Sequence, residues 1–383
     1  MTRSASRAPG TYLLALVLAA GALPGCGSSG SATTTKPDKP ATGPAPAQAK
    51  SQDSSKPATR NTPPGGQGPS TLVSSSELRE RALEVIEDGS RGSAPEVRAN
   101  AVEAAGLAAR RCESVIASGL KDDNVAVRSV AAMAAGRAKV EALAPALNPM
   151  LLDSSPFVRA AAVMGLARMG KPVDQTPLST MLLTDSSPRV RAHAAFCLGE
   201  IGNRSALGLL RQAARSSVPR ASDTEIKLMQ LQVSEAMVKL GDDETVQSIR
   251  AALYPSRPEE LEATALAVQI LGQVRDKGSS GAMIHLAETK DAAGSLLPAE
   301  IRLGIAGSLA KLGSPQGGFI ADEFVADQSP LLRAQAAAVY GEIGGQASLA
   351  RLSTMLGDPD ERVRISAARG VLTALSGGRA SAE

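Results

Sequence analysis

Apolar residues follow a helical rhythm from about residue 72 to residue 376, and no segment in between shows the strict alternation that predicts a strand. The first helical pattern begins at a capping box formed by Ser74 and Glu77, continues through Leu78 and Ala82, and ends at Gly89. The hydrophobic pattern therefore predicts an all-α protein.

Two kinds of predicted helix alternate along this region. Helices of the first kind resemble the segment 175–183, which is rich in Leu and Met. A turn such as Asp-Ser-Ser-Pro at 153–156 follows, in which proline favours the first turn of the next helix. The second helix carries Val-Arg-x-x-Ala-Ala and ends in glycine, which permits a left-handed exit. The repeating unit is a helical hairpin.

The hairpin recurs every 30 to 40 residues. We call the position of the arginine in the second helix the slot. In five copies an aspartate stands six residues before the slot: Asp122 and Arg128, Asp153 and Arg159, Asp185 and Arg191, Asp327 and Arg333, Asp358 and Arg364. Looser copies place Arg98, Lys227, Glu262 and Arg302 in the slot. Such a period predicts an α-solenoid of about nine hairpins, each packing on its neighbours.

We call these aspartate–arginine pairs the arginine ladder. An anion-binding strip is one interpretation of it. The favoured one is structural, with each arginine making a charge-assisted hydrogen bond within its repeat or to the next.

The ladder is broken in the middle of the array. Ala221, Ser256 and Leu296 stand where the aspartate is expected, and Glu262 replaces the basic residue. Insertions near 216–223 and between 275 and 297 lengthen the same repeats. Insertions in a solenoid often form its contact surface, and sequence drift explains them equally well.

The motif Asp-x-x-x-x-Val-Arg-x-x-Ala-Ala-x-x-Leu-Gly-x-x-Gly resembles the short HEAT repeats of the phycobilisome-lyase type, over roughly residues 72–376. The resemblance implies a curved stack of antiparallel helix pairs with the second helices on the concave face. With helices 8–10 Å apart, nine units would form an arc about 80–90 Å long with an open trough.

The N-terminus has the features of an export signal. Arg3 and Arg7 precede an apolar run, residues 12–23, that is too short to span a bilayer. The run ends in Leu-Pro-Gly-Cys at 23–26, which resembles the processing site of bacterial lipoproteins and implies acylation of Cys26. The alternative is an ordinary cleaved signal in which this cysteine is incidental.

The expected organisation is a signal peptide at 1–25, a disordered tether at 26–71, the repeat solenoid at 72–376 and a tail at 377–383. The tether is expected to be disordered because its Ser, Thr, Pro, Gly and Lys residues have little to bury. The expected location is the bacterial cell envelope, lipid-anchored and facing the periplasm. The outer membrane is preferred where one exists, because residue 27 is not aspartate.

The sequence offers little catalytic chemistry. His193 and His285 have no second ligand nearby in sequence, and Cys112 and Cys197 lie in different repeats, where buried free thiols are expected. No catalytic residue, metal ligand or cofactor is therefore expected, and the chain is expected not to be an enzyme. No small-molecule substrate is evident.

Charge and aromatic content bear on the partner. The net charge is +3, and its positive balance falls in the signal and tether, which leaves the repeats close to neutral. Aromatic residues make up only 2% of the chain. Both features argue against a nucleic-acid partner.

Three functional hypotheses remain. The favoured one is a lipid-anchored, non-enzymatic scaffold that binds another protein of unknown identity. The second is an enzyme or enzyme-accessory protein of the phycobilisome-lyase or HEAT-like oxidoreductase type. The third is an architectural envelope protein that self-associates, because Val371, Leu372 and Leu375 lie on a last helix without a polar cap.

Overall fold

The computed structural model of the protein describes residues 74–290 and 294–380, and these residues form an all-α solenoid of nine helical hairpins. The signal, the tether, Cys26 and the last three residues lie outside them. The first helices are α2 Ser75–Gly89, α4 Glu113–Gly119, α6 Ala144–Leu147, α8 Thr176–Thr184, α10 Leu207–Arg215, α12 Val246–Ala251, α14 Ser280–Glu288, α16 Gly318–Phe324 and α18 Gly345–Met355. The second helices are α3 Pro95–Ala105, α5 Val125–Arg137, α7 Pro156–Arg168, α9 Pro188–Ile201, α11 Asp223–Lys239, α13 Leu261–Gln273, α15 Ala299–Lys311, α17 Pro330–Ile343 and α19 Glu361–Ala380.

The local signals in the sequence place the helix ends well. Ser74 caps α2 by accepting a hydrogen bond from the Glu77 amide, as the capping box predicts. Proline begins α7, α9 and α17, and Gly202 leaves α9 in the left-handed conformation. None of the described helices has the length and apolar character needed to cross a bilayer.

The first helix of the third hairpin differs from the expected continuous helix. It is divided into a 3₁₀ segment Glu141–Leu143, the short α6 and a second 3₁₀ segment Pro149–Leu152. Proline lacks the amide hydrogen that an α-helix interior requires, and Pro145 and Pro149 fall within this stretch. Pro145 lies in the first turn of α6, where its missing amide hydrogen breaks no helical bond, and Pro149 begins the second 3₁₀ segment.

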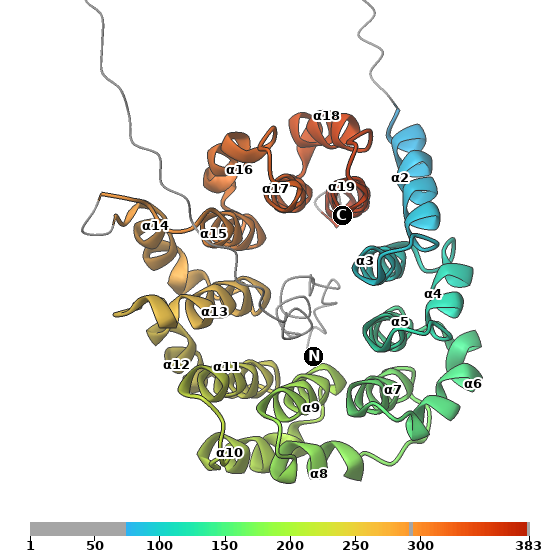
Figure 1. The fold of residues 1–383 in the computed structure, drawn as a ribbon, viewed down its shortest axis with the longest axis vertical. Helices are drawn as coiled ribbons and strands as arrows, with labels where there is room; N and C mark the ends of the chain where they lie inside the picture. The colour runs from blue at the N-terminus through green and yellow to red at the C-terminus, as the bar shows by residue number, and fades with distance from the viewer. Residues whose placement is uncertain (1–73, 291–293, 381–383) are drawn as a thin grey trace, which may run out of the picture. The chain divides into compact units, whose positions relative to one another are not determined.

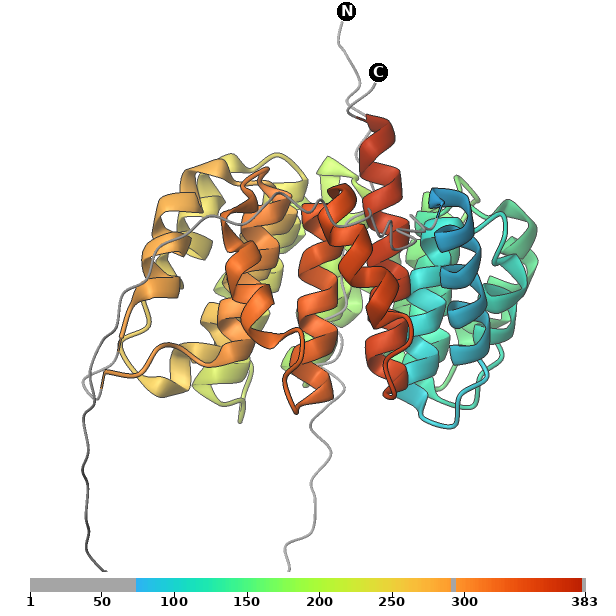
Figure 2. The ribbon, with the colours of Figure 1, turned by 90° about the horizontal axis from the view of Figure 1, so that it is seen from above.

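The repeats do not end in an open arc. Figure 1 shows the second helices on the inside and the first helices on the outside of a closed ring, in which red α19 packs beside blue α2 and α3. Ile365 of α19 is buried against Val97 and Ala101 of α3, and Gly89 of α2 leaves room for its side chain. In the perpendicular view of Figure 2 the helices stand side by side around the ring. The expectation of an open trough about 80–90 Å long is therefore wrong.

The closure also changes the interpretation of the last helix. Val371 and Leu372 are almost fully buried, in a ring whose last helix packs on its first hairpin. Two of the three apolar residues that suggested self-association are therefore covered within the chain itself, and Leu375 is half-buried.

Close approach of the second helices explains why the ring is tight. A Cβ added at Gly341 of α17 would lie 2.5 Å from the Cα atom of Gly370 in α19, and one added at Gly370 would lie 3.0 Å from the Ala337 carbonyl oxygen. These small residues bring the backbones of neighbouring second helices together.

We expect Gly341→Ala to lower the free energy of unfolding by about 1–3 kcal/mol, because the added methyl group meets backbone atoms that cannot move aside. Thermal unfolding followed by circular dichroism measures the effect. Gly208→Ala in exposed α10, where no atom lies within 4 Å of an added Cβ, is the matched control and should stabilise by about 0.5–1 kcal/mol. Equal stabilisation by both substitutions would contradict the close-packing argument.

Candidate functional site

The arginine ladder joins consecutive repeats. Arg128 Nε and Nη2 donate to the two carboxylate oxygens of Asp153 in the next repeat, at 3.0 and 3.2 Å. Its Nη1 donates to the carbonyl oxygens of Asp122 and Asp123 in its own turn, both at 2.9 Å. One guanidinium thus fixes the turn that precedes its helix and also holds the following repeat.

The same geometry occurs at some interfaces and not at others. Paired bonds of 2.7–2.9 Å join Arg98 to Asp122, and bonds of 2.8 Å join Arg333 to Asp358. Two of the remaining arginines, Arg159 and Arg364, donate to carbonyl oxygens of their own turns. Arg191 donates to the Asp185 carbonyl oxygen and reaches the hydroxyl oxygen of Ser216 instead of a carboxylate. Asp153, Asp185 and Asp327 each accept the amide of the residue two positions later, which completes the turn.

We expect the ladder to make stability depend on acid pH. The hydrogen bond from Arg98 holds the pKa of Asp122 below its ordinary value, and that from Arg333 does the same for Asp358. A carboxylate whose pKa is lowered by folding contributes its full stability above about pH 4, and this contribution is lost as the pH falls through the folded-state pKa. Asp122→Asn should therefore lower the thermal midpoint at pH 7 and make a smaller difference at pH 3. Asp88→Asn, at an exposed carboxylate, is the control. A difference of equal size at both pH values would contradict this account.

A charged cluster lies on the inner side of the ring around Glu200 of α9. The Glu200 carboxylate is only 8% exposed and pairs with Arg137 Nε of α5 at 3.3 Å and with Lys239 Nζ of α11 at 2.8 Å. Arg168 of α7 donates to the Glu200 carbonyl oxygen at 2.6 Å. Lys239 also pairs with Glu235, at 2.6 Å. We call these five residues the inner cluster, and they connect four consecutive second helices.

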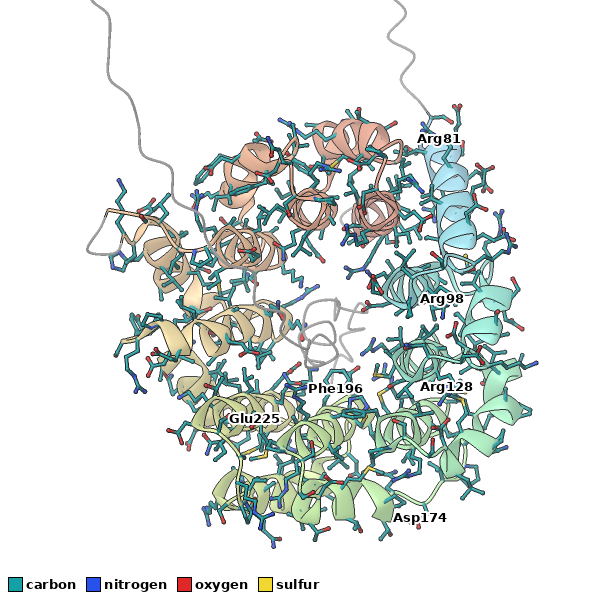
Figure 3. All side chains as sticks on the ribbon, in the orientation of Figure 1. Arg81, Arg98, Arg128, Asp174, Phe196 and Glu225 are labelled. Atoms are coloured by element: carbon teal, nitrogen blue, oxygen red, sulfur yellow. The ribbon has the colours of Figure 1, made fainter. Side chains whose placement is uncertain are left out.

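An aromatic ring supports the inner cluster. Figure 3 labels Phe196 on the inner side of the ring. Arg137 Cζ and Lys239 Nζ lie 5.6 and 5.1 Å from the centroid of this phenyl ring, within the range of cation–π attraction. The cluster therefore combines a central carboxylate with cations and an aromatic face.

The side chains of His193 and Cys197, which lie beside the inner cluster, are both uncharged at pH 7. His193 packs between the rings of Phe157 and Phe196, with its Nε2 3.1 Å from the Phe157 carbonyl oxygen. Burial lowers the pKa of His193 to about 4, so the ring is neutral at pH 7 and Nε2 acts as the donor. Burial likewise raises the pKa of Cys197, which keeps the thiol protonated. Cys197 and Cys112 are both free and buried, as expected.

A cleft of about 490 Å³ lies between the start of α11 and the segment that joins α12 to α13. Tyr254 lies at the cleft with 65% of its surface exposed, and Lys227 occupies the slot of this repeat. Within the described part of the chain, Lys227 makes no ion pair. The remaining lining residues are Asp223, Thr224, Ala251, Ala252, Pro255, Ser256, Arg257, Glu259, Glu260 and Ala263.

The cleft adjoins one of the two irregular regions that the sequence singles out, 216–223. The other, 275–297, contains three residues that are not described. Among the described residues, no group of three or more His, Cys, Asp or Glu side chains is arranged to hold a metal ion.

The sequence analysis did not predict the inner cluster, although the sequence contains a charge pattern that marks it. Arg137, Arg168, Glu200, Lys311 and Glu342 each stand nine residues after a slot, so charges of both signs recur at one level of the second helices. Which of these charges form ion pairs depends on the curvature of the stack. Arg137 of α5 and Glu200 of α9 are separated by α7, and they meet only because the stack is strongly curved.

Nine stacked hairpins with a shared core define a helical-repeat protein. The sequence profile of the HEAT repeats matches residues 83–167, 113–182 and 176–267. The chain therefore contains HEAT repeats, which confirms the fold expected from the repeating motif.

The chain is also similar to solved structures at low identity. Human deoxyhypusine hydroxylase in complex with glycerol is 19% identical, over 70% of this chain and 98% of that one, with a TM-score of 0.34. The CpcE–CpcF complex of phycocyanin lyase from Nostoc sp. PCC7120 is 17% identical, over 75% and 98%, with a TM-score of 0.38. The Kap95:Nup1 complex is 12% identical, over 79% of this chain and 48% of that chain, with a TM-score of 0.38. No curated protein matches the chain by sequence.

The expectation that the chain is not an enzyme is overturned by these comparisons. Two of the similar structures are named as a hydroxylase and a lyase. The inference considered only motifs within single repeats, whereas the solenoid brings together residues of different repeats, as it does in the inner cluster. The similarity is too low to assign either activity to this chain.

Proposed function

We propose that the chain is a scaffold that binds a segment of another protein in the cleft beside Lys227 and Tyr254. The observation that carries this proposal is the cleft itself, which combines an open volume of about 490 Å³, an exposed tyrosine and charges of both signs. Exposed aromatic anchors surrounded by a charged rim are typical of protein–protein contact sites. The packed repeats on either side of the cleft form a rigid frame around it.

Crosslinking in the producing cells tests this proposal. A photoreactive amino acid in place of Tyr254 should give one adduct of defined mass, whereas the same group in place of Leu152, which is 89% exposed and lies outside the cleft, should not. Ala251→Trp, which fills the cleft from its exposed wall, should abolish the adduct. Adducts of equal yield at both positions, or an adduct that persists in Ala251→Trp, would overturn the proposal.

We also propose that the chain is exported and anchored by acylation of Cys26, on the periplasmic side of a bacterial membrane and at the outer membrane where the cell has one. The supports are the basic residues Arg3 and Arg7, the short apolar run 12–23 and the cysteine at its end. Each buried methylene of an attached lipid contributes about 0.8 kcal/mol to membrane binding, so several acyl chains make a permanent anchor.

We expect Cys26→Ser to move the protein from the membrane fraction to the soluble fraction. Immunoblotting of fractionated cells measures this shift, and Cys112→Ser, at a buried thiol of the repeats, is the control that should remain with the membrane. A Cys26→Ser protein that stays in the membrane fraction would rule out the lipid anchor.

A further inference from the structure

The regular interfaces of the solenoid show what the slot cation requires. At three of them, the cation of one repeat binds the carboxylate that stands six residues before the next slot, as Arg128 binds Asp153. The side chains of this pair are only 18% and 14% exposed, so the interface closes over them. In these repeats an aspartate from the chain itself fills the position beside the cation.

At the cleft the cation is present and the carboxylate is missing. Lys227 occupies the slot, and the residue six positions before the next slot is Ser256. Both residues line the cleft. Ser256 is too short and carries no charge, so the position that Asp153 fills beside Arg128 is open beside Lys227.

The turn at the cleft is held in another way. In a regular repeat the aspartate carboxylate accepts the amide two residues later, as Asp153 does from Ser155. Here Glu260 reaches back, and its Oε2 accepts the amide of Ser256 at 2.7 Å. The turn is therefore held without its aspartate.

We propose that the cleft takes an aspartate or glutamate side chain of the partner protein, which pairs with Lys227 and completes the arginine ladder from outside the chain. This inference rests on the proposed scaffold function and names the chemistry of the partner. The exposed ring of Tyr254 lies at the same cleft and provides apolar area for the residues flanking that acid.

The other charged residues that line the cleft limit which acidic segments fit it. Arg257 is engaged by Glu260 at 3.2 Å, which leaves Lys227 as the cation of the cleft without an ion pair among the described residues. Asp223 and Glu259 also line the cleft and repel carboxylates, and only an acid that reaches Lys227 has this repulsion offset. The fitting segment therefore carries a single acidic residue that reaches Lys227, rather than an acidic run.

The chain supplies its own probe for this proposal. A blocked peptide with the sequence of residues 153–158, Asp-Ser-Ser-Pro-Phe-Val, presents the carboxylate that the regular ladder uses. The control peptide has asparagine in place of aspartate. In a titration followed by NMR, we expect the full-length protein to bind the aspartate peptide up to about fivefold more tightly, which is the upper end for an exposed ion pair.

Three variants distinguish the proposal from nonspecific binding in the cleft. Ser256→Asp places a carboxylate of the chain in the gap, and it should abolish the preference for the aspartate peptide without lowering the thermal midpoint. Ser256→Asn, of the same size and no charge, should keep the preference. Lys227→Met should lose it. A preference that survives both Ser256→Asp and Lys227→Met would overturn the proposal.

The peptide titration and the crosslinking experiment test the two proposals separately. If the crosslink at residue 254 forms but neither peptide is preferred, the scaffold proposal stands and the ladder-completion proposal fails. If the crosslink is absent in every variant, the scaffold proposal fails as well.

Discussion

Replacing Glu200 with glutamine should lower the free energy of unfolding by about 3–5 kcal/mol. The carboxylate pairs with both Arg137 and Lys239 and is almost entirely shielded from water. Glutamine keeps the shape of the side chain and removes its charge, so the two cations lose their common counter-charge in a poorly solvated place. Chemical denaturation of the purified protein measures the loss.

Two further variants separate this effect from a general loss of a surface charge. Glu84→Gln, at an exposed position of α2, should change the stability by less than about 0.5 kcal/mol. Arg137→Met added to Glu200→Gln should recover part of the loss, because it removes one of the two cations that lose the Glu200 carboxylate, whereas Lys239 keeps its pair with Glu235. An unchanged denaturation midpoint in Glu200→Gln would show that the inner cluster does not stabilise the ring.

Ile365→Ala should lower the free energy of unfolding by about 2–5 kcal/mol and also loosen the closure of the ring. Ile365 is 2% exposed and packs on Val97 and Ala101 of the first hairpin, so its loss leaves a cavity where the two ends of the array meet. Small-angle X-ray scattering should show a larger radius of gyration than for the unaltered protein.

Ile305→Ala in α15 is the matched control for this second effect. Ile305 is fully buried within the array, so its loss should cost similar stability without changing the radius of gyration. If both variants scatter as the unaltered protein does, the contact between α19 and the first hairpin does not depend on Ile365.

The sequence predicted the hairpins because the information for each one is local. The cap at Ser74, the turn at Asp153 and the glycine at Gly202 each specify an element boundary within a few residues. The same arrangement repeated nine times predicts stacking, because a single hairpin cannot bury its apolar face alone.

Closure of the ring could not be predicted in the same way. It depends on the sum of small rotations between neighbouring repeats, and a few degrees at each interface separate an open arc from a ring. The contact of Ile365 with Gly89 and Val97 joins residues that are far apart in the sequence. The inner cluster has the same cause, because Arg137 reaches Glu200 only in a strongly bent stack.

The candidate binding site was predictable in part. The missing aspartates at Ala221 and Ser256 marked the irregular repeats from the sequence. The sequence does not show which side chain holds a turn that lacks its aspartate. At Ser256 this side chain is Glu260, four residues later, whose carboxylate accepts the Ser256 amide.

The packing of α19 on the first hairpin affects how this protein unfolds. Linear repeat arrays fray from their terminal units, which exchange amide hydrogens faster than the centre does. Here each terminal hairpin has a neighbour on both sides, so neither is a weak point from which melting can spread. Amide exchange at α2 and α18 should be as slow as in the middle helices, and the whole circle should melt cooperatively in one transition.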